Sequence, residues 1–142
     1  DSGDMIACGV YDTLKAAPRL LLRTAIHGVA DRLKSEGIAF ETLDALYEQT
    51  EDFDELCELA VKKIIELARQ EETLCYAVSE PQNDATVRLL AQKLPEDVEL
   101  CVLSGMTLAD AAACAVIPFG VNTENLRTLT ALSALDRRIS HR

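Results

Sequence analysis

Three short segments carry small and polar side chains of the kind that contact ligands. They are residues 24–28, 79–83 and 104–107, with the sequences T-A-I-H-G, S-E-P-Q-N and S-G-M-T. Two of them lead into predicted helices, whose free N–H groups can bind anionic or carbonyl groups of a ligand. Spacing alone supports neither a Ser-His-Asp arrangement nor a catalytic carboxylate pair. The residues therefore predict that a ligand binds at these segments, at one edge of the fold, but they do not indicate which reaction takes place there.

Each segment also has a purely structural interpretation. Thr107 is well placed to cap a helix, because threonine is a common N-cap residue. Residues 79–83 have the composition of an ordinary surface loop. His27 is equally consistent with a histidine that simply lies in a loop. The sequence leaves both interpretations open for all three segments.

The elements that would position these segments alternate between strands and helices. Apolar runs predict strands at residues 19–24, 38–42, 73–78 and 98–103, with a further extended segment at 126–132. Helical periodicity predicts helices at residues 10–17, 29–36, 52–69, 84–94 and 107–116. This alternation is typical of an α/β fold, with a mostly parallel sheet and helices on both faces. In such a sheet ligands bind where strand ends meet at a switch in strand order, and the three segments fall at predicted strand ends.

The predicted elements also have recognisable ends. Asp52 followed by Glu55 suits a capping box at the start of the longest helix. Gly37 is expected to end the helix that begins near Val29.

Length and charge narrow the class of protein. The chain has 142 residues, enough for one domain, and we place that domain at residues 1–135, with 136–142 as a tail or the start of a linker. Acidic residues outnumber basic ones by 24 to 14, which argues against a nucleic-acid partner, since phosphate binding needs a basic face. No apolar run reaches the ~18 residues of a membrane-spanning helix, and no signal peptide is recognisable. We expect a cytoplasmic protein without a membrane partner.

The five cysteines show no metal or disulfide pattern. None are spaced as C-x-x-C, and each lies in an apolar stretch, which predicts free, buried thiols. The two histidines are far apart in sequence, so no metal site is expected.

A spaced series in the first half of the chain resembles a known family. It comprises R-T-A-I-H at 23–27, G-I at 37–38, D-A-L-Y-E at 44–48 and D-F at 52–53. The series is similar to the N-terminal domain of the tetrapyrrole (corrin/porphyrin) methylase family, of the type that bacteria fuse to a MazG nucleotide pyrophosphohydrolase. The pattern of that group is roughly R-T-x-x-H-P, E-G-I, D-x-L-Y-E and D-F.

Other segments extend the resemblance over nearly the whole chain. Residues 76–78 and 86–90 match the strand and helix around the family's P-G-H-P loop, and residues 102–107 match its P-G-x-S/T turn. Residues 2–4 look like the end of its G-x-G-P-G-D loop. The middle series is the most specific part.

The resemblance implies an S-adenosylmethionine-dependent methyltransferase built from two α/β domains with the cofactor between them. The positions that match its cofactor loops are Gly3, Asp4, Ser79, Glu80, Pro81, Ser104, Gly105 and Thr107. The substrate-side candidates are Arg23, Thr24 and His27. It also implies a small-molecule methyl acceptor such as a tetrapyrrole, a homodimer, and a parent protein with a second methylase domain and a pyrophosphohydrolase domain. The chain is then expected to be a fragment without turnover in isolation.

Departures from the family pattern keep a second function open. Glu80 brings a negative charge into a P-G-H-P loop that has lost its glycine, and Ser2, Gly28 and Ser104 stand where the family has proline. The alternative is therefore a degenerate, non-catalytic regulatory or dimerisation module attached to a nucleotide pyrophosphohydrolase. A flavodoxin-like nucleotide-binding domain ranks last, because no G-x-G-x-x-G loop is present.

Overall fold

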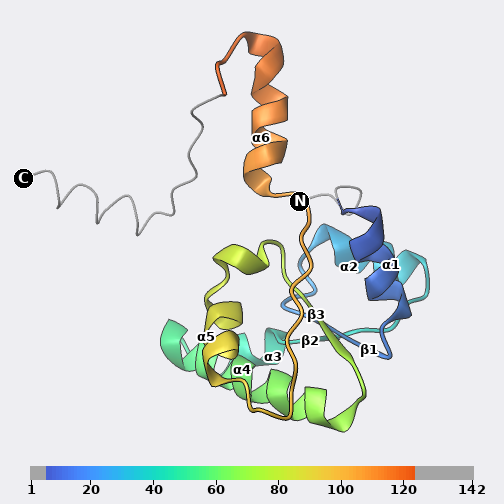
Figure 1. The fold of residues 1–142 in the computed structure, drawn as a ribbon, viewed down its shortest axis with the longest axis vertical. Helices are drawn as coiled ribbons and strands as arrows, with labels where there is room; N and C mark the ends of the chain where they lie inside the picture. The colour runs from blue at the N-terminus through green and yellow to red at the C-terminus, as the bar shows by residue number, and fades with distance from the viewer. Residues whose placement is uncertain (1–5, 124–142) are drawn as a thin grey trace, which may run out of the picture. The chain divides into compact units, whose positions relative to one another are not determined.

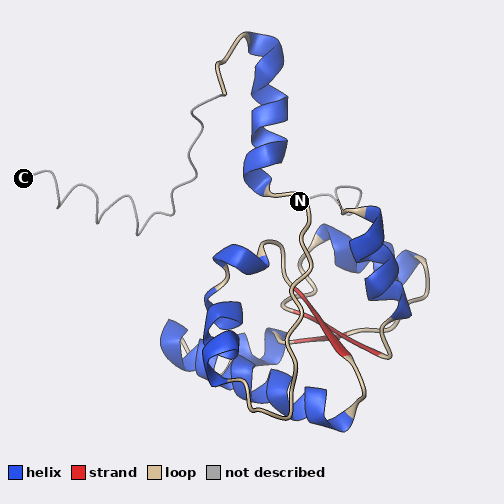
Figure 2. Ribbon diagram, in the orientation of Figure 1, coloured by secondary structure: helices blue, strands red, loops and turns tan. Residues whose placement is uncertain are grey.

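The structure of the chain, a computed structural model, describes residues 6–123 and alternates helices with strands (Figures 1 and 2). Two compact units divide it, residues 1–106 and 107–142. The elements of the first are α1 (Cys8–Ala16), β1 (Arg19–Leu22), α2 (Gly28–Ser35), β2 (Glu41–Thr42), α3 (Asp44–Tyr47), α4 (Phe53–Gln70), β3 (Leu74–Ala77), the 3₁₀ turn η1 (Pro81–Asn83) and α5 (Ala85–Lys93). Gly3, Asp4, the predicted extended segment 126–132 and the predicted boundary after Leu135 lie outside the described residues.

The sheet has three parallel strands in the order β2-β1-β3. In the central strand, Leu21 pairs with Glu41 of β2 on one side and with Tyr76 of β3 on the other. The strands coincide with three of the predicted runs, although β2 is only two residues long. The predicted α/β class with a parallel sheet is confirmed at this level.

Helices cover both faces of the sheet, as the continuous apolar run of β1 requires. Leu20 and Leu22 pack into a buried cluster with side chains of α1 and α2. Leu21 points to the opposite face, since side chains alternate along a strand, and packs into a second cluster supplied by α4 and α5. Figure 1 shows these two pairs of helices on opposite sides of the strands.

The helix ends follow the predicted chemistry in part. The Asp52 carboxylate caps α4 by accepting the Glu55 amide at 2.8 Å. The reciprocal half of the predicted capping box is replaced, because the Glu55 carboxylate accepts from the Thr50 hydroxyl at 2.6 Å. Gly37 follows α2 with φ of 71°, a left-handed conformation that glycine adopts without strain.

The predicted strand at residues 98–103 is a wrong prediction. The structure gives these residues no helix or strand, and Leu100, Val102 and Leu103 are 37%, 54% and 43% exposed. An apolar run becomes a buried strand only when it finds a neighbouring strand and a covering layer, and within residues 6–123 this run has neither. The composition was typical of a strand, but tertiary context overrides it.

The cysteine prediction was right about free thiols and largely wrong about burial. The described cysteines form no disulfide, but only Cys57 is buried and Cys75 half-buried, whereas Cys8, Cys101 and Cys114 are exposed. Cys101 lies in an uncovered apolar segment and Cys114 in a helix without buried side chains, whereas Cys8 is exposed although Ile6 and Tyr11 beside it pack into the core. Within the described residues, no helix is long and apolar enough to cross a membrane.

The second unit begins with α6 (Leu108–Val116), followed by the 3₁₀ turn η2 (Ile117–Phe119). None of the α6 side chains is buried. The helix starts at a full capping box, in which the Thr107 hydroxyl accepts the Asp110 amide and the Asp110 carboxylate accepts the Thr107 amide.

Candidate site at the strand-exit edge

The carboxyl ends of the three strands lie at one edge of the sheet because the strands are parallel. Residues 24–28 lead from β1 to α2 on one face, and residues 79–83 lead from β3 toward α5 on the other. Neighbouring strands whose connections leave in opposite directions define a switch point, the position at which open α/β sheets bind ligands. We call this region, residues 23–28, 44–47 and 77–84, the strand-exit edge.

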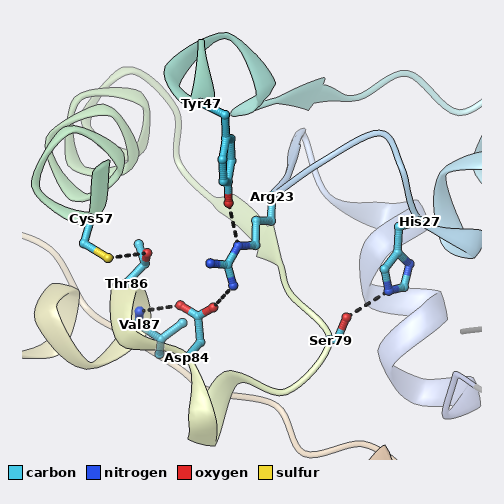
Figure 3. A network of polar contacts seen from close by, with 8 residues as sticks. All are labelled: Arg23, His27, Tyr47, Cys57, Ser79, Asp84, Thr86 and Val87. Carbon is cyan, nitrogen blue, oxygen red and sulfur yellow. Dashed lines mark hydrogen bonds and ion pairs between the residues drawn. The ribbon is translucent and has the colours of Figure 1, made fainter. Parts of the chain in front are cut away.

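A hydrogen bond joins the first two predicted segments. His27 Nε2 lies 2.9 Å from the Ser79 hydroxyl oxygen (Figure 3). His27 is also the N-cap residue of α2, where its Nδ1 accepts the Val29 amide at 3.2 Å. Burial lowers the pKa of His27, which favours the neutral ring. The structure therefore brings two of the three predicted segments together.

The exit of β2 fixes the conformation of residues 24–28. Asp44 accepts the Ala25 amide at 2.9 Å. Hydrogen bonds from the Thr24 hydroxyl and then from this amide lower the pKa of Asp44. The Thr24 oxygen in turn accepts the Ile26 amide at 3.1 Å. Thr24, a predicted substrate-side residue, thus has a clear local role in shaping the loop.

Arg23 is held in place by residues from two other elements. Its Nη1 donates to the Asp84 carboxylate, and its Nε donates to the Tyr47 hydroxyl at 2.8 Å (Figure 3). Asp84 is buried and also caps α5 by accepting the Val87 amide at 3.0 Å. Within residues 6–123, Nη2 of Arg23 makes no hydrogen bond.

Sequence reasoning missed several polar residues around Arg23. The Thr86 hydroxyl, also buried, donates to the Cys57 sulfur at 3.6 Å. The Tyr76 hydroxyl is buried without a partner among the described residues, and burial raises the pKa of Tyr76. Asp84 carried one usable signal, its position just before a helix. Tyr47 and Asp84 are 24 and 61 residues from Arg23, so spacing gave no hint of these contacts.

The third predicted segment, residues 104–107, lies where the first unit ends and the second begins. Within residues 6–123, no hydrogen bond or ion pair links Ser104 or Gly105 to residues 24–28 or 79–83. A Cβ added at Gly105 would have no neighbour within 4 Å. The Thr107 hydroxyl is engaged by Asp110 at 2.6 Å in the capping box, in agreement with its structural interpretation. Glu80 directly precedes η1, which Pro81 begins.

Two shallow grooves lie along the helices. The larger, about 540 Å³, follows α4 and includes Arg69 and Lys93, and the other, about 430 Å³, lies between α4 and α5 and includes Cys57 and Arg88. Neither is lined by residues 24–28 or 79–83. Among the described residues, no three His, Cys, Asp or Glu side chains are grouped to hold a metal ion.

The fold and the strand-exit edge define a small parallel α/β domain with polar side chains at the carboxyl ends of its strands. Comparison with known proteins adds one relative. The chain is 27% identical over 110 residues to "Uncharacterized protein YabN" of Bacillus subtilis (strain 168), an alignment that spans 76% of the chain and 22% of that protein. No family model matches the chain, and no solved structure matches it significantly.

Proposed function

We propose that the chain is an S-adenosylmethionine-dependent methyltransferase domain of the tetrapyrrole methylase type, with its cofactor at the strand-exit edge. The observation that carries the proposal is the meeting of residues 24–28 and 79–83 at the β1/β3 switch point, joined by His27 and Ser79. The family resemblance of the R-T-A-I-H and D-A-L-Y-E segments supports the same reading.

The polar side chains at the strand-exit edge are better suited to bind a ligand than to transfer a proton. Methyl transfer from a sulfonium is an in-line displacement, so positioning supplies most of the catalysis. Arg23 offers Nη2 to an anionic group of the methyl acceptor, and Ser79 offers an exposed hydroxyl to the cofactor. The methyl acceptor, a tetrapyrrole or another small molecule, would lie on the side of Arg23, Thr24 and His27.

Calorimetric titration of S-adenosylmethionine into the chain tests the proposal. We expect saturable binding in the sub-millimolar range, competition by S-adenosylhomocysteine, and no binding of ATP. Gly105→Ala tests separately whether the third predicted segment also reaches the cofactor, because the added methyl group meets nothing in the free protein. A weaker affinity with an unchanged circular dichroism spectrum would place Gly105 against the cofactor. An absence of binding up to millimolar concentrations contradicts the proposal.

Two observations favour the second candidate, a non-catalytic regulatory or dimerisation module. Residues 100–106 expose four large apolar side chains: Leu100, Val102, Leu103 and Met106. Clustered exposed apolar side chains are typical of protein interfaces. Glu80, half-buried beside Ser79, adds negative charge where an anionic ligand would bind.

Sedimentation equilibrium distinguishes this candidate. We expect the chain to dimerise, and the double variant Val102→Ser/Leu103→Ser to shift it toward monomer. Ile26→Ser is the matched control, because Ile26 is 90% exposed but lies outside residues 100–106. Dimerisation through this segment without S-adenosylmethionine binding supports the second candidate over the first. A wild-type chain that stays monomeric contradicts it.

A further inference from the structure

The hydrogen bonds of His27 determine which residue is the donor in its contact with Ser79. A neutral imidazole has one nitrogen that donates and one that accepts. Nδ1 of His27 accepts the Val29 amide proton, so it carries no proton of its own. The ring proton is therefore on Nε2, and the Nε2–H donates to the Ser79 oxygen at 2.9 Å.

Because His27 is the donor, the pair cannot be a nucleophile with its general base, and Ser79 is left able to donate its own proton. A histidine that donates to a serine cannot also remove the serine proton, so this pair is not a nucleophile with its general base. The Ser79 oxygen accepts from His27, and its own proton is left to donate elsewhere. Ser79 is exposed, and within residues 6–123 it makes no other hydrogen bond, so its hydroxyl proton can donate to a ligand.

The backbone and the core beneath α2 hold the imidazole of His27 in this orientation. His27 is fixed at the start of α2, where its carbonyl also accepts the Ala30 amide at 2.9 Å. Val29 and Ala30 are both buried in the cluster beneath that helix. The imidazole therefore stands on a packed element, which is what a positioning residue needs.

We propose that Ser79 donates its hydroxyl proton to an acceptor atom of the cofactor at the strand-exit edge, and that His27 is the positioning residue that orients this hydroxyl. The inference rests on the proposed function for the identity of the ligand, S-adenosylmethionine. The tautomer on which it depends is a property of the ligand-free protein and can be measured independently.

The first experiment measures the tautomer. In the full chain labelled with ¹⁵N-histidine, long-range ¹H–¹⁵N correlation spectra near neutral pH should show the Nε2–H form for His27. His27→Asn identifies its signals against those of His141 by their loss. Ser79→Ala should leave the tautomer unchanged, because the Val29 amide sets it. An Nδ1–H form overturns the assignment, since Ser79 would then donate to His27 instead of to the ligand.

The second experiment measures S-adenosylmethionine affinity by calorimetry. Ser79→Ala should weaken it roughly 3- to 10-fold, the usual net effect of one lost hydrogen bond. His27→Asn keeps a good N-cap for α2 but is too short to reach Ser79, and it should cause a smaller loss. Ser35→Ala, which removes a hydroxyl bonded to the Arg32 carbonyl at the other end of α2, is the matched control and should change nothing.

The double variant separates positioning from a general structural role. If His27 acts through Ser79, His27→Asn should weaken binding in the wild-type background and not in the Ser79→Ala background. Equal losses in both backgrounds overturn the positioning role. Binding that Ser79→Ala leaves unchanged overturns the donor role while the proposed function stands. A wild-type chain that binds no S-adenosylmethionine overturns the proposed function and this assignment together.

Discussion

The guanidinium of Arg23, directly after the central strand, donates to the carboxylate of Asp84, the N-cap residue of α5. The Asp84 side chain is only 3% exposed, and that of Arg23 is 34% exposed. The pair links two elements that leave the sheet toward opposite faces. Since Asp84 serves both the ion pair and the helix cap, the shape of the strand-exit edge should depend on it more than on any surface charge.

The first prediction concerns this double role. Asp84→Asn keeps a side chain that caps helices well but removes the charge opposite Arg23. We expect a loss of about 1–3 kcal/mol in the free energy of unfolding, as for a buried polar group that loses its partner. Asp84→Ala should cost about 1 kcal/mol more, because the cap is also lost. Urea denaturation followed by far-ultraviolet circular dichroism measures both.

An exposed pair provides the control for that prediction. Asp97 binds Arg69 at 2.9 Å, with side chains 61% and 52% exposed. Exposed ion pairs contribute little to stability because water screens their charges, so Asp97→Asn should have little effect. If Asp84→Asn proves no more costly than Asp97→Asn, the Arg23–Asp84 pair does not hold the edge together.

The second prediction is a pH dependence that comes from His27. Its folded pKa is lowered by burial, so the folded protein binds fewer protons than the unfolded chain just below the ordinary value of 6.5. The stability contribution is complete above that value and is lost as the pH falls toward the folded pKa. Protonation would also place a hydrogen on Nδ1, where the Val29 amide now donates. Thermal unfolding as a function of pH should show this decline.

His27→Asn should flatten the decline between pH 6.5 and the folded pKa, because asparagine caps α2 without titrating. A slope that His27→Asn leaves unchanged would show that other groups, and not His27, bind the protons.

The sequence predicted the elements that have a strong local signal. The helix at 52–69 carries its own periodicity and cap, and it appears as α4 with Asp52 at its N-cap. The runs at 19–24 and 73–78 became neighbouring strands, β1 buried and β3 half-buried, because apolar residues on both faces of a strand favour two covering layers. The run at 98–103 had a similar composition but formed no strand, because a strand needs a neighbouring strand to hydrogen-bond with.

Strand topology made it possible to predict which loops meet at the site, but not which side chains pair there. Parallel strands place residues after β1 and β3 at one edge, so His27 and Ser79 could be expected to approach each other across 52 residues of chain. Which polar groups pair there depends on side-chain geometry and burial, so Asp84 and Tyr47 were missed as partners of Arg23. The segment at 104–107 was expected at the same edge through a strand that the structure does not form.

The third prediction uses the exposure of the cysteines. In the native protein, iodoacetamide should modify Cys8, Cys101 and Cys114 fastest, because all three are exposed. Cys75 should react more slowly, since burial raises its pKa and so reduces the reactive thiolate. Cys57, buried beside Thr86, should be the slowest. Peptide mapping by mass spectrometry after timed labelling gives the order.

Labelling in denaturant is the control for the cysteine order. There the five thiols should react at similar rates, because unfolding removes the differences in burial. If Cys101 proved as protected as Cys57 in the native protein, residues 98–106 would be covered in solution. That result would favour the interface expected at Val102 and Leu103.

The last prediction tests what shapes the loop that carries His27. Asp44 accepts the Ala25 amide at 2.9 Å, so Asp44→Ala should raise the hydrogen-exchange rate of that amide roughly 3- to 10-fold. Glu48→Ala, at an exposed position directly after α3, should leave it unchanged. Because the pKa of Asp44 is lowered, protection in the wild type should persist at acidic pH and weaken only below its ordinary value of 3.8. Exchange that is equally fast in both variants and the wild type would mean that Asp44 does not hold the loop, and that His27 must be positioned by α2 alone.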